Sequence, residues 1–452
     1  MMDQTTTGST RHRALAVIPL VTLALTAAGV LAVTSQAAAP DGSEPAPETV
    51  EAAPDPVQAH AQDMIERGRQ VFRFDRMGSH TFFSRTLKIH QALNGVSPRA
   101  ALSLGLKVDA DALPPSVIDA IQQGEVDLDD PAVTRLLIDL DAVVGIQGQL
   151  TPDGEGLWEV GITCALCHST VDDSVAPGIG SRLDGWANRD LDVGQIINLA
   201  PNLQPLADLL GVDVPTVRTV LQSWGPGKFD AHLNLDGQAF RPDGESAAVL
   251  IPPAFGLAGV NLHTYNGWGS VTYWNAFVGN LEMNGKGRFW DPRLADPAKF
   301  PVASAAGFDD VADEPDVVTD DLAALHFYQL ALAAPEPPPG SFDAEAAERG
   351  EELFAGKAQC AQCHVPPLYT EPGWNMHTPE EIGIDAFQAE RGPENAYRTT
   401  PLKGLWTHTK GGFYHDGRFA TLQEVIDHYD DHFGLSLTDQ EKGDLEEFLM
   451  SL

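Results

Sequence analysis

The chain has 452 residues, enough for two or more domains with their own hydrophobic cores. Its 64 acidic residues outnumber its 28 basic residues, and the formal net charge of −36 excludes a general affinity for nucleic acids or anionic membrane surfaces. The acidic residues are spread along the chain, so we interpret the charge as a solvated surface; the alternative is electrostatic steering of a basic electron-transfer partner. Only four cysteines are present.

The N-terminus has the pattern of a secretory signal. Two arginines precede an apolar run from Ala14 to Val33, and three alanines at 37–39 provide a cleavage site of small residues. The sequence therefore predicts a signal peptide over 1–39 and a periplasmic or otherwise extracytoplasmic protein. The apolar run is also long enough to remain as a membrane anchor. Residues 40–58 are rich in Pro, Glu and Ala, which favours a disordered linker.

Helical periodicity dominates the remaining sequence, and the alternation typical of strands is scarce. Helices are predicted at 59–72, 130–145, 214–224, 320–333, 342–355 and 436–452. The last of these has Thr438 or Ser436 as a candidate N-cap. We therefore expect a mainly α fold with long loops.

All four cysteines belong to two CxxCH motifs. The first is Cys164, Cys167 and His168 in GITCALCHST, and the second is Cys360, Cys363 and His364 in QCAQCHVPP. This spacing is typical of covalent haem attachment, in which two thiols add to the vinyl groups and the adjacent imidazole binds the iron. A four-thiolate zinc site and a pair of disulfides are the alternatives. Zinc does not need a His after each second Cys, so we expect two c-type haems.

Several short elements occur twice in the same order. ERG-x3-F stands at 66–72 and at 348–354, each followed by a CxxCH motif, and P-x-x-G-L then H-T-x-x-G follows at 253–267 and at 401–412. The repetition indicates a duplicated haem domain. We expect an N-terminal haem domain at 59–340, with a large insertion over about 73–160, and a C-terminal cytochrome c-like haem domain at 341–452.

The segment RTTPLKGLWTHTKGGFYHDGRFATLQEVIDHY and the terminal LTDQEKGDLEEFL resemble the C-terminal domain of the bacterial di-haem cytochrome c peroxidases. That superfamily includes the di-haem enzyme of methylamine utilisation and a rubber oxygenase. The resemblance is strong over 342–452, patchy over 250–290 and absent over much of 73–160. It implies an oxidoreductase that reduces hydrogen peroxide at the N-terminal haem with electrons passed through the C-terminal haem.

The resemblance also implies partners and further ions. The donor would be a small electron-transfer protein, a cytochrome c or a cupredoxin, and a calcium ion often lies between the domains of such enzymes. Neither nucleic acid nor a membrane partner is expected, apart from the N-terminal anchor considered above.

Three site residues follow from the resemblance alone. Tyr429 stands where the family places the sixth ligand of the electron-transfer haem, with Met376, His377, His408 and His428 as competitors. Trp268 stands at the place of the inter-haem tryptophan, with Trp224 and Trp274 as alternatives, and Glu282 in LEMNG at the place of the acid–base glutamate. The iron ligands expected are thus His168, His364 and Tyr429.

The family's distal histidine has no clear counterpart after the first CxxCH motif. Five residues remain as candidates for the sixth ligand of the first haem, which are His80, His90, His232, His263 and Met283. If none of them binds, that haem is permanently open. Two other functions therefore stay open, a pure electron carrier with two six-coordinate haems and an oxygenase or oxidase that uses oxygen. Neither a P-loop nor a GxGxxG fingerprint nor a serine nucleophile elbow is present in the sequence.

Overall fold

Helix α1 (Pro56–Phe74) begins the region covered by the computed structural model, which describes residues 55–452. Asp55 caps the helix by accepting a hydrogen bond from the Val57 amide, and Pro56 occupies the first turn, where no intrahelical donor is needed. The helix thus begins inside the predicted linker 40–58. The predicted signal peptide 1–39 lies outside the described residues.

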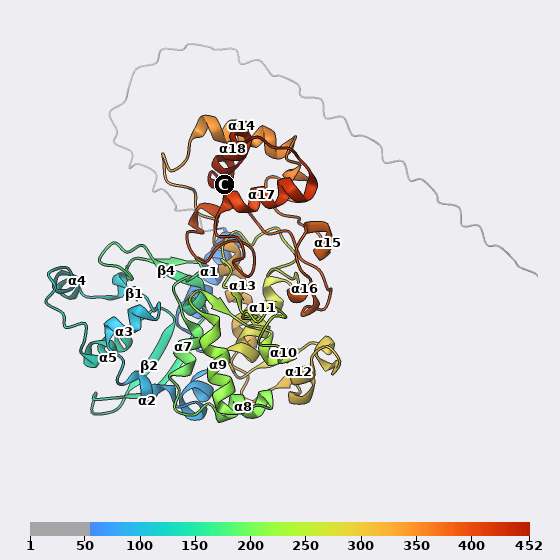
Figure 1. Cartoon of the computed structure of the whole chain (residues 1–452). Coiled ribbons are helices and arrows are strands. Elements are labelled where there is room, and N and C mark those ends of the chain that lie inside the picture. Colours follow the sequence, from blue (N-terminus) through green and yellow to red (C-terminus); the bar gives the residue numbers. More distant parts are fainter. Residues whose placement is uncertain (1–54) are drawn as a thin grey trace, which may run out of the picture. The chain divides into compact units, whose positions relative to one another are not determined.

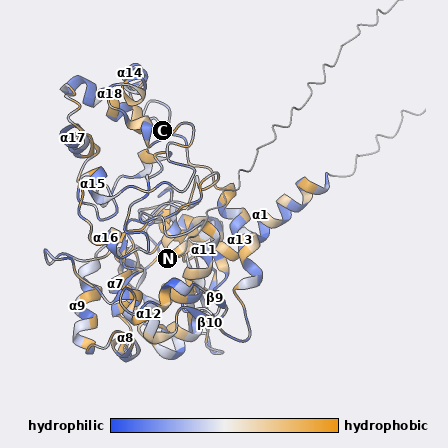
Figure 2. Cartoon of the chain, turned by 90° about the vertical axis from the view of Figure 1, so that its right-hand side faces the viewer, coloured by the Kyte–Doolittle hydropathy of each residue, from blue (hydrophilic) through white to orange (hydrophobic). Residues whose placement is uncertain are grey.

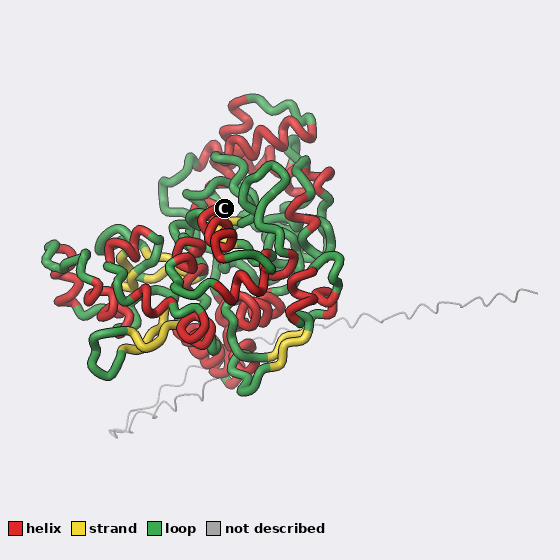
Figure 3. Tube along the Cα trace, turned by 60° about the horizontal axis from the view of Figure 1, so that its bottom comes forward, coloured by secondary structure: helices red, strands yellow, loops and turns green. Residues whose placement is uncertain are grey.

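Helices and loops account for most of the described chain, so the expected mainly α fold is confirmed (Figure 3). The α-helices after α1 are α2 (Ile89–Leu93), α3 (Pro98–Ser103), α4 (Pro115–Gln122), α5 (Pro131–Asp139), α6 (Ala165–His168), α7 (Val193–Asn198), α8 (Gln204–Leu210), α9 (Val214–Trp224), α10 (Leu233–Asp236), α11 (Val271–Phe277), α12 (Pro301–Ala306), α13 (Leu322–Ala331), α14 (Ala344–Ala355), α15 (Pro379–Ile382), α16 (Phe387–Glu390), α17 (Leu422–Phe433) and α18 (Asp439–Met450). Two π-helices, η1 (Thr81–Thr86) and η3 (Val278–Glu282), and five 3₁₀ turns, η2 (Ala110–Ala112), η4 (Pro292–Ala295), η5 (Thr319–Asp321), η6 (Cys360–Gln362) and η7 (Leu405–Thr407), complete the described helical elements.

The strands are short and form two-stranded sheets. They are β1 (Val108–Asp109), β2 (Ile146–Leu150), β3 (Leu157–Ile162), β4 (Ser169–Val171), β5 (Ile179–Gly180), β6 (Arg182–Asp184), β7 (Lys228–Phe229), β8 (Val249–Leu250), β9 (Arg288–Trp290) and β10 (Asp310–Ala312). β1 and β5 pair in parallel, whereas β2–β3, β4–β6, β7–β8 and β9–β10 pair antiparallel. Each sheet stabilises a loop and does not form a layer of its own.

Two helix pairs repeat one packing arrangement, α1 against α13 and α14 against α18 (Figure 1). Each first helix crosses its partner at the Gly of an ERG sequence. A Cβ atom on Gly68 would lie 2.0 Å from the Ala324 carbonyl oxygen, and one on Gly350 would lie 2.0 Å from the Asp444 carbonyl oxygen. Only glycine permits so close an approach between helices. The ERG repetition in the sequence is therefore a repetition of tertiary packing.

The segment between α1 and the first CxxCH motif folds into a lobe of short helices and strands, η1 to β3 (Figure 1). Its buried side chains include Leu87, Leu137, Ile138 and Val160, which belong to one hydrophobic cluster. Strand β3 runs from this cluster directly to Cys164, so the lobe is attached to the motif. A Cβ atom on Gly145, whose φ is +76°, would lie 2.2 Å from the Cα atom of Leu166, so the lobe packs on the motif without space between them.

Hydrophobic and hydrophilic residues are mixed along α1 and α13, consistent with one packed face and one solvated face (Figure 2). Within residues 55–452, no helix has the length and hydrophobicity needed to span a bilayer.

Candidate functional site

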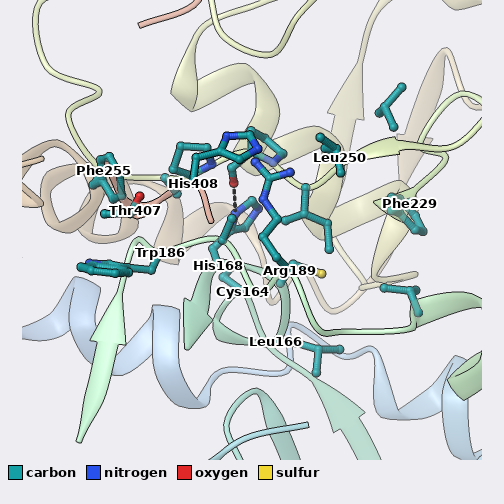
Figure 4. A pocket seen from close by; sticks show the side chains of 18 of the residues that line it. Cys164, Leu166, His168, Trp186, Arg189, Phe229, Leu250, Phe255, Thr407 and His408 are labelled. Carbon is teal, nitrogen blue, oxygen red and sulfur yellow. Dashed lines mark hydrogen bonds between the residues drawn. The ribbon is translucent and has the colours of Figure 1, made fainter. Parts of the chain in front are cut away.

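The first CxxCH motif lies at the short helix α6, where the side chains of Cys164, Cys167 and His168 line one cavity (Figure 4). The His168 Nδ1 atom is 3.1 Å from the Pro252 carbonyl oxygen. Burial raises the pKa of both thiols to about 12 and lowers the pKa of His168 to about 4. The imidazole is therefore neutral, with Nδ1 engaged and Nε2 free to bind a metal.

The second motif repeats this arrangement at η6. The His364 Nδ1 atom is 3.3 Å from the Tyr369 carbonyl oxygen. The backbone of Thr400 also favours the protonated form of His364, and Thr400 has the position in the sequence repeat that Pro252 has in the first copy. Burial lowers the pKa of His364 to about 4 and raises that of Cys360 to about 11. All four cysteines are free thiols.

One cavity of about 1160 Å³, lined mainly by apolar side chains, includes residues of both motifs. Two half-buried arginines, Arg189 and Arg398, also line it. Burial lowers the pKa of each guanidinium group to about 10. Neither arginine forms an ion pair with a carboxylate of residues 55–452. Arg189 lies close to His168 in Figure 4.

These groups fit covalently bound haem. Haem offers two vinyl groups to a pair of thiols, an iron to the free imidazole nitrogen, and carboxylates to the guanidinium groups of Arg189 and Arg398, which form no ion pair within residues 55–452. The two arginines were not predicted from the sequence, because an isolated arginine has no pattern that marks it as a cavity residue. In the described residues, no group of three or more His, Cys, Asp or Glu side chains is placed to hold a metal ion. The alternative of a four-thiolate zinc site therefore has no counterpart there.

Glu282 is the last residue of the π-helix η3, a type of helix that often occurs at functional sites. Its carboxyl group lines the cavity close to Cys167, and neither oxygen has a hydrogen-bond partner in the described structure. Burial raises the pKa of Glu282 well above its ordinary value, and the charge of Asp230 adds to the rise. Burial therefore favours the protonated form of the Glu282 carboxyl group, whose proton faces the cavity that a bound group would occupy.

Trp268 is placed behind the cavity and not on its wall. The indole is 3% exposed, stacks on the His232 ring at 5.5 Å, and donates its N–H to Asp291 at 3.4 Å. Among the sequence candidates, Trp274 lines the cavity, whereas Trp224, at the end of α9, packs against Phe229.

Tyr265 and His415 occupy the cavity wall and were both missed as site residues. Their rings stack at 5.0 Å with an interplanar angle of 24°, and Tyr397 stacks on the other side of His415 at 5.1 Å. Two equivalent turns position them. The backbone bridge His263–Gly269 corresponds to Phe413–Phe419, and each turn has a residue with positive φ just before the stacked ring, Thr264 and Tyr414.

The structural repeat therefore differs in register from the H-T-x-x-G repeat of the sequence. It pairs TYNG with YHDG, so that Tyr265 corresponds to His415, while Trp268 corresponds to Arg418. An alignment of these two turns could have identified Tyr265.

A buried hydrogen-bond chain holds Tyr265 in place. The Asn266 amide nitrogen is 3.0 Å from His232 Nε2, His232 Nδ1 is 3.0 Å from the Tyr265 hydroxyl, and that hydroxyl is 3.1 Å from the Gln388 side-chain oxygen. Burial lowers the pKa of His232 well below its ordinary value. Because both ring nitrogens of His232 are engaged, it is not free to bind an iron.

Next to this chain of hydrogen bonds, Arg391 links the segment after the second CxxCH motif to the segment before it. Its guanidinium group lies 3.0 Å from Asp230 and 2.7 Å from Asp236, and all three side chains are buried. Burial raises the pKa of Asp230 to about 6, although the attraction of Arg391 opposes the rise.

Tyr429 lines the cavity on α17, in the second half, and its ring lies 6.2 Å from that of Tyr414. Burial raises its pKa, and the neighbouring Tyr414 hydroxyl opposes this rise. Three histidine competitors have an Nε2 atom within hydrogen-bond distance of another group: His377 at 2.8 Å from Glu371, His408 at 2.5 Å from the Gly412 carbonyl, and His428 at 2.9 Å from the Ile382 carbonyl. The Nε2 atoms of these three histidines are therefore already engaged by protein groups.

Of the candidates for the sixth ligand in the first half, His263 and Met283 line the cavity, and so does His232, which is engaged as described above. His80 and His90 are not among its lining residues in the described chain. His263 donates or accepts through Nε2 at 3.1 Å from the Val260 carbonyl, and burial lowers its pKa to about 4. Met283 is therefore the candidate that has no competing polar contact.

Comparisons with known proteins find two curated relatives and a solved structure that are similar to parts of the chain. No protein-family model matches the chain. Over 207 residues, 39% of this chain and 54% of the relative, the sequence is 28% identical to the methylamine utilization protein MauG of Methylorubrum extorquens. Over 149 residues, 24% of this chain and 40% of the relative, it is 30% identical to the cytochrome-c peroxidase IdrP1 of Denitromonas iodatirespirans.

The chain spans about half the length of the curated relatives it matches. A crystal structure of a MauG-like protein associated with microbial copper homeostasis shares 20% identity, with a TM-score of 0.31 over 49% of this chain and 80% of that chain. The names of the two sequence relatives agree with the family that the C-terminal segment resembles. The chain is therefore related to the superfamily of the di-haem cytochrome c peroxidases and MauG.

Proposed function

We propose that the protein is an exported di-haem c-type cytochrome that reduces hydrogen peroxide at its N-terminal haem, with electrons passed through its C-terminal haem. The observation that carries this proposal is the buried carboxyl group of Glu282, which has no hydrogen-bond partner and lines the same cavity as His168. The haem irons supply the redox chemistry and the open coordination position when bound. The polypeptide supplies the iron ligands, the proton and an apolar cavity wall.

The residues have separate roles in this proposal. His168 and His364 hold the irons through Nε2, because a backbone carbonyl engages Nδ1 in each case. Tyr429 is the sixth ligand in the C-terminal half. Glu282 moves a proton between the two oxygens of peroxide through its Oε1 and Oε2 atoms, which peroxide cleavage requires.

The two haem domains are proposed at 59–340 and 341–452. The support comes from the repeated helix crossing at Gly68 and Gly350, and from the repeated turns that carry Tyr265 and His415.

The sequence favoured Trp268 as the aromatic relay between the haems. We place this role on the stacked pair Tyr265 and His415, because both rings line the cavity, and we assign Trp268 to the layer behind, where it packs on His232.

The proposed electron donor is a small basic cytochrome c or cupredoxin outside the cytoplasm, which the net charge of −36 would attract. The test is peroxide-dependent oxidation of a reduced basic cytochrome c by the purified holoprotein. We expect turnover that weakens as ionic strength rises, because salt screens the attraction. Absence of any peroxide-dependent oxidation by several small donors would favour a pure electron carrier. Oxygen uptake without peroxide, in the presence of an organic compound, would favour an oxygenase or oxidase.

A further inference from the structure

The cavity extends beyond the two motifs into the lobe inserted between α1 and Cys164. Its wall there is formed by apolar side chains of η1, α2, α3, α5 and β3, among them Phe83, Leu93, Ala101, Leu137 and Val160. We call this part the lobe chamber. Protein interiors are close-packed, so a lobe with no ligand to bind would fill such a space with its own side chains.

Helix α4 covers the lobe chamber on the side of the solvent. None of its residues is buried, although Val117, Ala120 and Ile121 line the cavity. The exposed residues Ser116 and Asp127 line it as well, so the chamber reaches the surface beside this helix. In Figure 1, α4 lies at the outer edge of the lobe. Its Val117, Ile118 and Ile121 side chains are half-buried against the lobe's hydrophobic cluster, so α4 is attached to the core less firmly than the helices with buried residues.

One polar group in the chamber lacks a partner. Thr134 on α5 is 5% exposed and lines the cavity, and its hydroxyl oxygen has no hydrogen-bond partner in residues 55–452. Leaving a buried hydroxyl without a partner is unfavourable, so a ligand oxygen that forms a hydrogen bond with it would bind favourably.

The charges of the chamber distinguish between classes of ligand. Lys107 is the cation that lines this part, and its Nζ atom is already engaged by Asp190 at 2.7 Å. The net charge of −36 also repels anions. A carboxylate such as a fatty acid anion therefore finds no unpaired cation among the described residues of the lobe that line the chamber, whereas an uncharged molecule needs no counter-ion.

We propose that the lobe chamber binds an uncharged apolar organic molecule that carries one hydrogen-bonding oxygen, a ketone or an alcohol, with the oxygen at Thr134 and the chain among the apolar side chains. This inference does not depend on the proposed reaction with peroxide.

The test is isothermal titration of the full holoprotein with 2-octanone and, separately, with octanoate. We expect 2-octanone to bind at least tenfold more tightly than octanoate. Thr134→Val, which keeps the side-chain shape, should weaken 2-octanone binding about threefold to tenfold, the contribution of one hydrogen bond.

Two substitutions on α4 locate the binding. Ala120→Trp places a large ring into the chamber and should weaken binding at least tenfold, while Gln122→Trp on the exposed side of the same helix should leave it unchanged. Because Ala120 is only half-buried and Gln122 is exposed, both variants should fold, and thermal unfolding checks this. No heat of binding in the wild type, tighter binding of octanoate, or equal affinity in wild type and a folded Ala120→Trp variant would each overturn the proposal.

Discussion

The phenol ring of Tyr265 lies stacked on the imidazole of His415, 5.0 Å between ring centroids, although 149 residues separate them in the chain. The two rings come from equivalent turns of the two halves. Their contact forms part of the wall of the cavity that both CxxCH motifs line. It also links the segment before the second motif to the segment after it.

The stacked pair predicts which aromatic residue governs electron passage. Tyr265→Leu removes the ring from the cavity wall and should slow electron transfer between the two haems of the holoprotein, measured by rapid mixing with a reductant. Tyr265→Phe keeps the ring and should retain the rate. It should nevertheless lower the free energy of unfolding by about 1–3 kcal/mol, because the hydroxyl bonded to His232 and Gln388 is lost.

Trp268→Leu is the matched comparison, since it removes a buried ring from behind the wall. If Trp268→Leu slows electron transfer between the haems and Tyr265→Leu does not, the aromatic relay is Trp268.

Glu282→Gln tests the proposed proton transfer with almost no change in shape. Peroxide turnover should fall by about 10²-fold to 10⁴-fold, the usual contribution of a general acid–base group. Resting spectra and haem content should be unchanged. Glu155→Gln, at an exposed acid in the inserted lobe, should have normal turnover.

The same variant predicts a pH dependence of stability. Burial raises the pKa of Glu282 in the folded protein, so the folded state keeps a proton that the unfolded state releases above its ordinary pKa. This group therefore favours folding at low pH, and its contribution is lost as the pH rises from about 4.5 toward the folded pKa. Urea unfolding at several pH values should show the wild type losing stability relative to Glu282→Gln over that window. A constant difference at all pH values would mean that the carboxyl group is solvated.

Arg391→Met should destabilise the molecule strongly. It leaves Asp230 and Asp236 buried without their counter-ion, which costs about 3–5 kcal/mol. Arg99→Met breaks an exposed ion pair with Asp129 and should cost less than about 1 kcal/mol. Urea unfolding compares the two, and equal effects would contradict the assigned role of Arg391 between the halves.

Two alanine substitutions test the repeated helix crossing. Gly350→Ala forces a Cβ atom against the Asp444 carbonyl and should cost about 1–3 kcal/mol by overpacking. Gly443→Ala lies in α18, with no atom within 4 Å of the added methyl group, and should stabilise by about 0.5–1 kcal/mol. Thermal unfolding should show opposite shifts, and shifts of the same sign would contradict the crossing.

Tyr429→Phe should change the EPR and visible spectra of the C-terminal haem alone, because it removes the proposed ligand oxygen. Tyr369→Phe is the control, since its ring packs against Phe354 and Phe448 and is not among the residues that line the cavity. An unchanged spectrum in Tyr429→Phe would direct attention to Met376.

Local patterns in the sequence predicted the elements that depend on neighbouring residues. The helices now seen as α14 and α18 were expected, and Thr438 is the N-cap of α18, with Glu441 completing a capping box. The helix predicted over 130–145 was too long: α5 ends at Asp139, because Asp141 has a positive φ and Val143 bridges Val108. Tertiary pairing overrode helical periodicity there.

The positions of Arg189, Arg398 and Tyr265 in the cavity could not be predicted in the same way. Each reaches the cavity through contacts between segments distant in the chain, and an isolated Arg or Tyr has no periodicity to mark it. The two His-Thr pairs look alike in the sequence, whereas the backbone bridges His263–Gly269 and Phe413–Phe419 show that His263 corresponds to Phe413.

The most direct test of the central claim is the electronic and EPR spectrum of the purified ferric holoprotein, recorded before and after one equivalent of hydrogen peroxide. We predict two haems, one high-spin and one low-spin, and a spectral change on adding peroxide that is lost or greatly slowed in Glu282→Gln. Two low-spin haems that peroxide leaves unchanged would contradict the account and identify the protein as an electron carrier.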